Sequence, residues 1–284
     1  MFDIYTYLCM FFIYAFLGWC TEVVYCTVTT GKIVNRGFLN GPVCPIYGFG
    51  MIFIIFILTP YTENAALLFV GSAAVCSLLE LTAGWILKKM FHTSWWDYSD
   101  QPFNLGGYIC LKFSLLWGIG GVFMMRIIQP LTLYWISVLP YKLGIFLLWR
   151  CGMTFTVDTN ATIATIAHLN KDLKWLSRQA ELIHSASDRM AEKLGGRRLT
   201  DAAKAEEIKA ESHERIEKMK EDQRNRIERI KGDQKARFER IKAEIESRKR
   251  FGRARLLKAF PDMKHLEFDE FLQEIKEKLG DVRK

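Results

Sequence analysis

Residues 65–87 read AALLFVGSAAVCSLLELTAGWIL, and Glu80 is the only charged side chain among them. A helix that crosses the hydrocarbon core of a bilayer needs about 20 mainly apolar residues. This stretch therefore predicts a membrane-spanning helix. An ionisable side chain inside such a helix costs free energy unless it has a partner or a function, so Glu80 is a candidate site residue.

Further apolar runs flank this stretch on both sides. They occupy residues 4–28, 45–59, 108–128 and 141–166. Residues 131–139, between Pro130 and Pro140, are too short to cross and predict an interfacial or re-entrant piece. We therefore expect an all-α protein with a polytopic transmembrane bundle of five spans, or six as the alternative, followed by a long charged cytoplasmic helix.

The charged residues divide the chain near residue 166. Only eight of the 39 Lys and Arg residues and seven of the 31 Asp and Glu residues lie in residues 1–166, so the remaining 31 basic and 24 acidic residues lie beyond it. This split excludes a single soluble globular domain. The predicted parts are a transmembrane domain (1–166), a helical extension and hinge (167–195), a charged rod (196–250), and a basic segment with a short amphipathic helix (251–284).

Lysine and arginine in the flanks predict the orientation, because short cytoplasmic loops carry an excess of both. Lys32 and Arg36 follow the first run, and Lys88 and Lys89 follow the third, whereas residues 60–64 carry neither. We expect a multi-pass protein of the cell's inner membrane, with the N-terminus outside and the tail in the cytoplasm.

Four ionisable side chains in the apolar runs stand out, because the predicted topology places all of them in the cytoplasmic part of the bilayer. They are Glu22, Glu80, Lys112 and Asp158. The two long cytoplasmic loops add polar side chains at the same end: Asn35, Arg36, Asp97 and Asn104. Together they predict a polar cavity that opens to the cytoplasm. The equally weighted alternative is that Arg36 pairs with Glu22, Asp97 or Glu80 and only locks the bundle.

Motifs of catalysis and cofactor binding do not occur in the sequence. It contains no GxxxxGK[ST], HExxH, GxGxxG or GxSxG, and its seven cysteines form no CxxC pair. We therefore expect no enzyme activity, no catalytic residues, no cofactor and no metal, and the cysteines are interpreted as packing residues.

Ordered motifs at the loops resemble a known family. They are GWCTE (18–22), NRGFL (35–39), CPIYG (44–48), Glu80, WDYS (96–99), Asn104 and GYICL (107–111). In these residues the chain resembles the Putative ABC-transporter type IV membrane family over about residues 5–165. The resemblance implies a permease-like membrane component, which would need a separate ATP-binding subunit because this sequence has no ATPase motif.

An 11-residue repeat runs through the tail from residue 204. Its apolar positions are 216/219, 227/230 and 238/241. Eleven residues in three turns predict a nearly straight or slightly right-handed helix. The apolar stripe is thin, so the pattern fits two structures equally well. One is a weak coiled coil, through which the tail would form homo-oligomers, and the other is a solitary charged helix.

A basic patch follows the rod. It consists of Arg248, Lys249, Arg250, Arg253, Arg255 and Lys258. The patch predicts binding to anionic lipid or to a protein partner, and less so to nucleic acid. The alternative is that it is a solvated linker without a ligand.

Two functions follow from these patterns. The first is the membrane component of a transporter in the lipid bilayer, for a cation or a proton-coupled solute, because the acidic side chains in the spans outnumber Lys112. The second is a non-transport membrane anchor or scaffold whose cytoplasmic coiled-coil-like tail recruits a partner.

Overall fold

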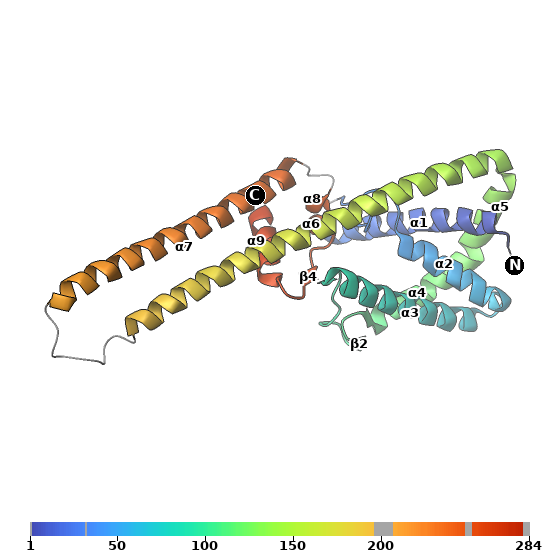
Figure 1. The fold of residues 1–284 in the computed structure, drawn as a ribbon. Coiled ribbons are helices and arrows are strands. Elements are labelled where there is room, and N and C mark those ends of the chain that lie inside the picture. Colours follow the sequence, from blue (N-terminus) through green and yellow to red (C-terminus); the bar gives the residue numbers. More distant parts are fainter. Residues whose placement is uncertain (1, 32, 196–206, 248–251, 281–284) are drawn as a thin grey trace. The chain divides into compact units, whose positions relative to one another are not determined.

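The computed structural model describes residues 2–31, 33–195, 207–247 and 252–280, and it is mostly helical (Figure 1). The helices are α1 (Ile4–Thr30), α2 (Pro45–Leu58), α3 (Ala65–Phe91), α4 (Leu111–Phe123), α5 (Gln129–Val138), α6 (Tyr141–Gly195), α7 (Glu207–Ser247), α8 (Arg253–Ala259) and α9 (Asp269–Gly280). The short elements are η1 (Thr59–Tyr61), η2 (Met124–Ile128), β1 (Thr93–Ser94), β2 (Asn104–Leu105), β3 (Ile109–Cys110) and β4 (Lys264–His265).

Three of these helices are long and apolar enough to cross a membrane. They are α1 (over Ile4–Thr29), α3 (Ala65–Phe91) and the continuous helix Leu111–Val138, which is formed by α4, η2 and α5. Helix α2 with η1 (Pro45–Tyr61) is a shorter apolar helix. The prediction of a mostly helical chain with helices that could span a membrane is thus confirmed. The number of spans stays a prediction.

The structure differs from the sequence analysis at residues 131–139, which continue the helix from α4 instead of forming a separate piece. A π-helical turn, η2, comes directly before Gln129 and Pro130. Proline cannot donate the regular backbone hydrogen bond of a helix. The π-helical turn shifts the backbone hydrogen bonds just before Pro130, and the helix continues without a break.

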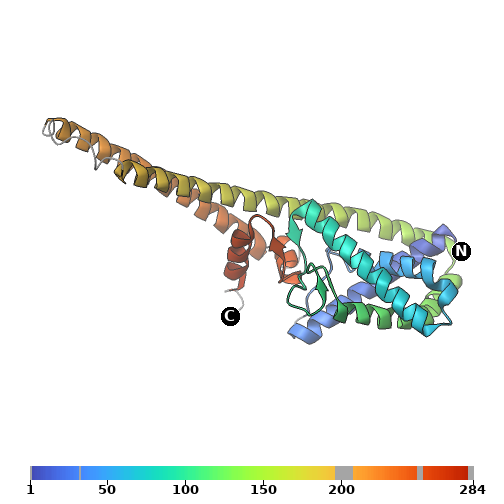
Figure 2. The same ribbon diagram turned by 90° about the horizontal axis from the view of Figure 1, so that it is seen from below.

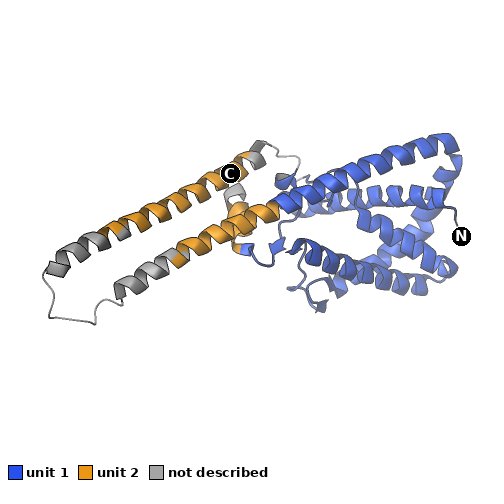
Figure 3. Cartoon of the chain, in the orientation of Figure 1, with its two compact units in different colours: residues 1–168, 248–269 blue, residues 169–247, 270–284 orange. Residues whose placement is uncertain are grey.

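Two compact units make up the chain (Figure 3). Unit 1 contains Met1–His168 and Arg248–Asp269, and unit 2 contains Leu169–Ser247 and Glu270–Lys284. Helix α6 contributes its first part to unit 1 and its second part to unit 2.

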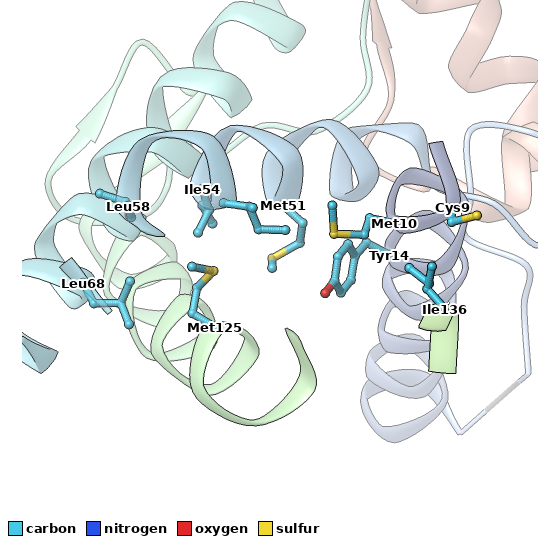
Figure 4. Packing of buried hydrophobic residues seen from close by; sticks show 10 residues of the cluster. Cys9, Met10, Tyr14, Met51, Ile54, Leu58, Leu68, Met125 and Ile136 are labelled. Atoms are coloured by element: carbon cyan, nitrogen blue, oxygen red, sulfur yellow. The ribbon is translucent and has the colours of Figure 1, made fainter. Parts of the chain in front are cut away.

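The core of unit 1 lies between α1, α2, α3 and the η2–α5 segment. Figure 4 shows its buried side chains meeting between these helices. They are Cys9, Met10, Tyr14, Met51, Ile54, Ile55, Leu58, Leu68, Met125 and Ile136. Tyr14 also donates a hydrogen bond to the buried Gln129, so α1 and α5 are joined by a polar contact within an apolar core.

Unit 1 also holds two loops and a returning segment that matter for function. We call residues 33–44 the first loop, residues 92–110 the hairpin loop, and residues 252–269 the C-terminal segment. Strands β2 and β3 pair in the hairpin loop, beside the end of α3 (Figures 1 and 2). Strand β1 pairs with β4, with Thr93 opposite His265, so the C-terminal segment joins the hairpin loop.

Apolar contacts hold the C-terminal segment in the same place. The Trp95 side chain is 4 % exposed, and its ring lies 4.9 Å from that of Phe260 and 5.1 Å from that of Phe38. Leu256 and Met263 are each 1 % exposed. Burial of these side chains fixes the segment against both loops.

In unit 2, α7 contacts α6. Arg237 donates to Asp172 at 2.5 Å and lies 5.1 Å above the ring of Trp175. Phe238 and Ile241, the last apolar pair of the 11-residue repeat, are buried. The structure describes the backbone but not the side chains at positions 216 and 219.

Candidate functional site

The acidic side chains predicted in the spans each contact a loop or a neighbouring helix. Glu22 lies in α1, and its Oε1 accepts a hydrogen bond from the Tyr47 hydroxyl at 2.6 Å. Its Oε2 lies 3.7 Å from Nε of Arg36 in the first loop. The structure therefore places Arg36 with Glu22, one of the three pairings that the sequence left open.

A glycine in α1 makes room for this contact. A Cβ at Gly18 would lie 2.2 Å from Cγ of Tyr47, a distance that real side chains do not adopt. Tyr47 therefore packs directly against the α1 backbone, one turn from Glu22. The motif GWCTE thus supplies both the carboxylate and the space for the tyrosine that binds it.

Glu80 lies in α3 and is 8 % exposed. Its Oε1 accepts from the Tyr98 hydroxyl of the hairpin loop, and its Oε2 accepts from Nε1 of Trp117 in α4, both at 3.1 Å. Both donors are neutral, and among the described residues Glu80 has no basic partner. Trp117 also contacts Tyr47, with 5.6 Å between the ring centroids, so two aromatic side chains connect Glu80 to Glu22.

Asp158 lies in α6 and holds the first loop through three hydrogen bonds. Its Oδ1 accepts from the backbone N–H and the side-chain Nδ2 of Asn40, at 3.1 Å and 2.8 Å. Its Oδ2 accepts from the backbone N–H of Gly41 at 2.7 Å. Hydrogen bonds from backbone N–H groups to a carboxylate are short and strong, so Asp158 fixes the position of this loop.

Asn35 connects the first loop internally and to α1. Its Oδ1 accepts from Nε1 of Trp19 at 2.7 Å, and its Nδ2 donates to the carbonyl oxygen of Asn40 at 2.7 Å. An asparagine at this position therefore shapes the loop that Glu22 and Asp158 bind.

Lys112 does not join the acidic side chains. It is exposed at the start of α4, with its Nζ 5.8 Å from the ring centroid of Phe113. Depth along the helix was the only signal that the sequence offered, and it carries no information on which face of the helix a residue occupies.

Asp97 and Asn104 shape the hairpin loop. Asp97 accepts from Ser99 with Oδ1 and from Nζ of Lys264 with Oδ2, the latter at 2.7 Å. Lys264, and after it Ser99, lower the pKa of Asp97 to about 2. Asn104 donates to the carbonyl oxygens of Ser99 and Gln101.

Arg255 of the predicted basic patch lies inside the protein, 4 % exposed. Its guanidinium donates to the carbonyl oxygens of Gly37 and Phe38 and to Oδ1 of Asn40, at 2.5, 2.8 and 3.0 Å. Burial lowers the pKa of Arg255 to about 10, and the nearby charge of Asp158 opposes that shift. Asn40 therefore connects Asp158 with the C-terminal segment.

The other basic residues of the patch are placed differently. Lys258 is exposed and Arg253 is half-buried. Arg248, Lys249 and Arg250 lie outside the described residues.

Tyr47, Tyr98, Trp117 and Asn40 are the partners that the sequence analysis missed. Two of them stood inside motifs already noted, Tyr47 in CPIYG and Tyr98 in WDYS. In the part of the chain that the structure describes, no group of three or more His, Cys, Asp and Glu side chains is arranged to hold a metal ion.

Comparison with known proteins assigns the family. A family model described as Putative ABC-transporter type IV matches residues 9–163. The chain belongs to this family. No curated protein and no solved structure gave a match.

The family region contains the three acidic side chains and both loops. Glu22, Glu80 and Asp158 all lie within the residues matched to the Putative ABC-transporter type IV family. Arg255 and the rest of the C-terminal segment lie outside them. The acidic residues and loops therefore belong to the family's part of the chain, and the segment bound to those loops comes from beyond it.

Proposed function

We propose that the chain is the permease-like membrane component of a transporter for a cation or a proton-coupled solute. In this proposal α1, α2, α3, the helix Leu111–Val138 and the first part of α6 are five spans of an inner-membrane protein. The N-terminus lies outside, and the tail lies in the cytoplasm, as the lysine and arginine distribution favours.

The observation that carries the proposal is the setting of Glu80. Glu22 has Arg36 as a counter-charge, and Asp158 has backbone donors. Glu80 is buried, and its only hydrogen-bond donors among the described residues are two neutral groups, with no counter-charge. A carboxylate inside an apolar bundle is costly without a counter-charge, and by default it marks an ion or proton path. A proton or a cation would supply the missing charge.

The contacts around Glu80 support a coupling to the loops. Tyr98 joins Glu80 to the hairpin loop, and Trp117 with Tyr47 joins it to Glu22 and so to Arg36 of the first loop. A change in the charge of Glu80 would alter hydrogen bonds that reach both loops. A transport site needs such a connection if the binding of its ion is to change the conformation of the loops at one end of the bundle.

Family membership supports the partner in this proposal. An ABC-type transporter hydrolyses ATP, and this sequence contains no GxxxxGK[ST] motif. A separate ATP-binding subunit would therefore supply the ATP site.

The test is cation and proton flux through the full-length chain. The protein is purified from its native membranes with the subunits that accompany it, and is reconstituted into liposomes that hold a pH-sensitive dye. Flux is followed after a sodium, potassium or pH gradient is imposed, with and without ATP. Glu80→Gln, which keeps the size but not the charge, should lower the flux at least about tenfold, equivalent to 1.4 kcal/mol.

Two further variants make this test specific. Glu63→Gln is the matched control, because Glu63 is exposed outside the apolar helices, and it should leave the flux unchanged. Glu80→Asp keeps the charge and should retain part of the flux even if Glu80→Gln folds poorly. The proposal fails if the wild-type protein carries no flux, or if a folded Glu80→Gln variant carries as much as the wild type.

A further inference from the structure

A cavity of about 300 Å³ lies between the hairpin loop and the C-terminal segment, within unit 1. Lys88, Ser94, Trp96, Tyr108, Lys264 and Leu266 are among its lining residues. The lining thus combines two lysines, a hydroxyl group and apolar side chains. It is separate from the carboxyl group of Glu80, which does not line it.

The acidic side chains that line the cavity are engaged within the protein. Asp97 accepts from Ser99 and from Lys264, and Asp269 accepts from the backbone N–H of His265. The charge of Lys264 is therefore matched by that of Asp97.

Lys88 is the charge that lacks a counter-ion. Its Nζ lies 5.3 Å from the ring centroid of Tyr108, and among the described residues it forms no ion pair. The Ser94 hydroxyl also has no hydrogen-bond partner among them. A lysine and a hydroxyl group that both line one cavity and have no partner among the described residues are groups that can bind a phosphate.

Exposed apolar side chains lie at the same end of α3 as Lys88. Lys88 lies in the last turn of α3, a helix apolar enough to span a membrane. The same end of α3 exposes Trp85 and Met90, 54 % and 61 %, and Leu266 at the cavity is 54 % exposed. Tryptophan and lysine at the end of a span are typical of the level of the lipid headgroups. A soluble phosphate would need none of this apolar surface, whereas the acyl chains of a lipid would cover it.

We propose that this cavity binds the phosphate of an anionic phospholipid headgroup, with Lys88 as its counter-ion and the Ser94 hydroxyl as a hydrogen-bond donor. The lipid's acyl chains lie on the exposed apolar side chains at the end of α3. Binding at Lys88 is distinct from the basic patch at residues 248–258, whose Arg255 is occupied by the first loop. The site does not depend on transport.

The experiment measures lipid binding to the full-length chain in detergent by native mass spectrometry. The probes are dioctanoyl phosphatidylglycerol, dioctanoyl phosphatidylcholine and inorganic phosphate. Lys88→Gln should weaken the binding of phosphatidylglycerol about tenfold, because a charged hydrogen bond is lost. Ser94→Ala should weaken it by a smaller factor.

Lys89→Gln is the matched control. Lys89 is the next residue on the same helix end and carries the same charge, but its Nζ lies 5.0 Å from the ring centroid of Trp85, and it does not line the cavity. Lys89→Gln should bind phosphatidylglycerol like the wild type. Phosphatidylcholine should bind more weakly than phosphatidylglycerol in both proteins.

Three outcomes would overturn the proposal. Equal losses in Lys88→Gln and Lys89→Gln would indicate a general surface charge effect without a cavity site. Competition by inorganic phosphate at the concentration of the lipid would indicate a soluble anion as the ligand. Binding of phosphatidylglycerol that no variant weakens would place the lipid elsewhere.

Discussion

At the scale of single residues, we expect His265 to make the docking of the C-terminal segment sensitive to pH. Its Nδ1 accepts from the backbone N–H groups of Glu267 and Phe268, so the proton of the neutral ring is on Nε2. Burial lowers the pKa of His265 below its usual 6.5, and the nearby Glu267 and Asp269 only partly oppose the shift. Docking is therefore most stable above about pH 6.5 and weakens as the pH falls toward the lowered pKa.

Amide hydrogen exchange checks this prediction. The Leu266 amide, which donates to the His92 carbonyl, should lose protection between pH 7.5 and pH 5 after correction for the intrinsic exchange rate. Asp97 stays ionised in that range, because its pKa is about 2. His265→Asn keeps an acceptor for the two amides and should abolish the pH dependence. If His265→Asn lost protection over the same range, another group would be responsible.

The sequence predicted which acidic residues form the site better than it predicted the hydrogen-bond partners of those residues. Glu22, Glu80 and Asp158 stand out because charges are rare in apolar runs, and the predicted topology places them at similar depths. Which donor reaches each carboxylate depends on contacts between helices far apart in sequence. Tyr98 at Glu80 and Asn40 at Asp158 are examples, because nothing local to either acid specifies them.

At the scale of elements, one backbone hydrogen bond next to the β1–β4 pair contributes to the docking of the C-terminal segment. The Leu266 N–H donates to the carbonyl oxygen of His92 at 2.8 Å, while the Leu266 side chain is 54 % exposed. Leu266→Pro removes this donor and should cost about 1 kcal/mol of docking free energy. Leu266→Ala keeps the donor and should cost less.

Protection of residues 252–269 in hydrogen exchange distinguishes the two variants. Leu266→Pro should exchange faster throughout the segment, and Leu266→Ala should resemble the wild type. Equal protection in both variants would show that the remaining contacts, chiefly those of Arg255 and the burial at Trp95 and Phe260, hold the segment without this hydrogen bond.

Element bounds were predictable where hydropathy changes sharply and less so elsewhere. The runs at 4–28 and 65–87 correspond to α1 and α3, because Gly31 caps the end of α1 and Asn64 caps the start of α3; α3 itself continues past the run through Lys88 and Lys89 to Phe91. Residues 131–139 were predicted as a separate piece from two prolines, but a π-helical turn lets the helix continue through Pro130. Whether a proline ends a helix depends on this local accommodation, which the sequence pattern does not reveal.

At the scale of the whole molecule, chain order does not follow the two compact units. The C-terminal segment belongs to unit 1 although α7 and the second part of α6, which precede it, belong to unit 2. Periodicity predicts helices such as α7 but carries no signal for a later segment that returns to an earlier loop. Arg255 was therefore interpreted as surface charge, whereas the fold buries it against Gly37 and Phe38.

The central claim is that the Glu80 carboxyl group takes up and releases a proton or a cation within the membrane. The most direct test is its reaction with dicyclohexylcarbodiimide, an apolar reagent that modifies protonated carboxyl groups, in native membranes that contain the full-length chain. Modified peptides are quantified by mass spectrometry. We expect Glu80 to be labelled, labelling to fall as the pH or the cation concentration rises, and Glu22, paired with Arg36, to react less. Labelling of Glu80 that is absent, or that is the same at every pH and cation concentration, would contradict the claim.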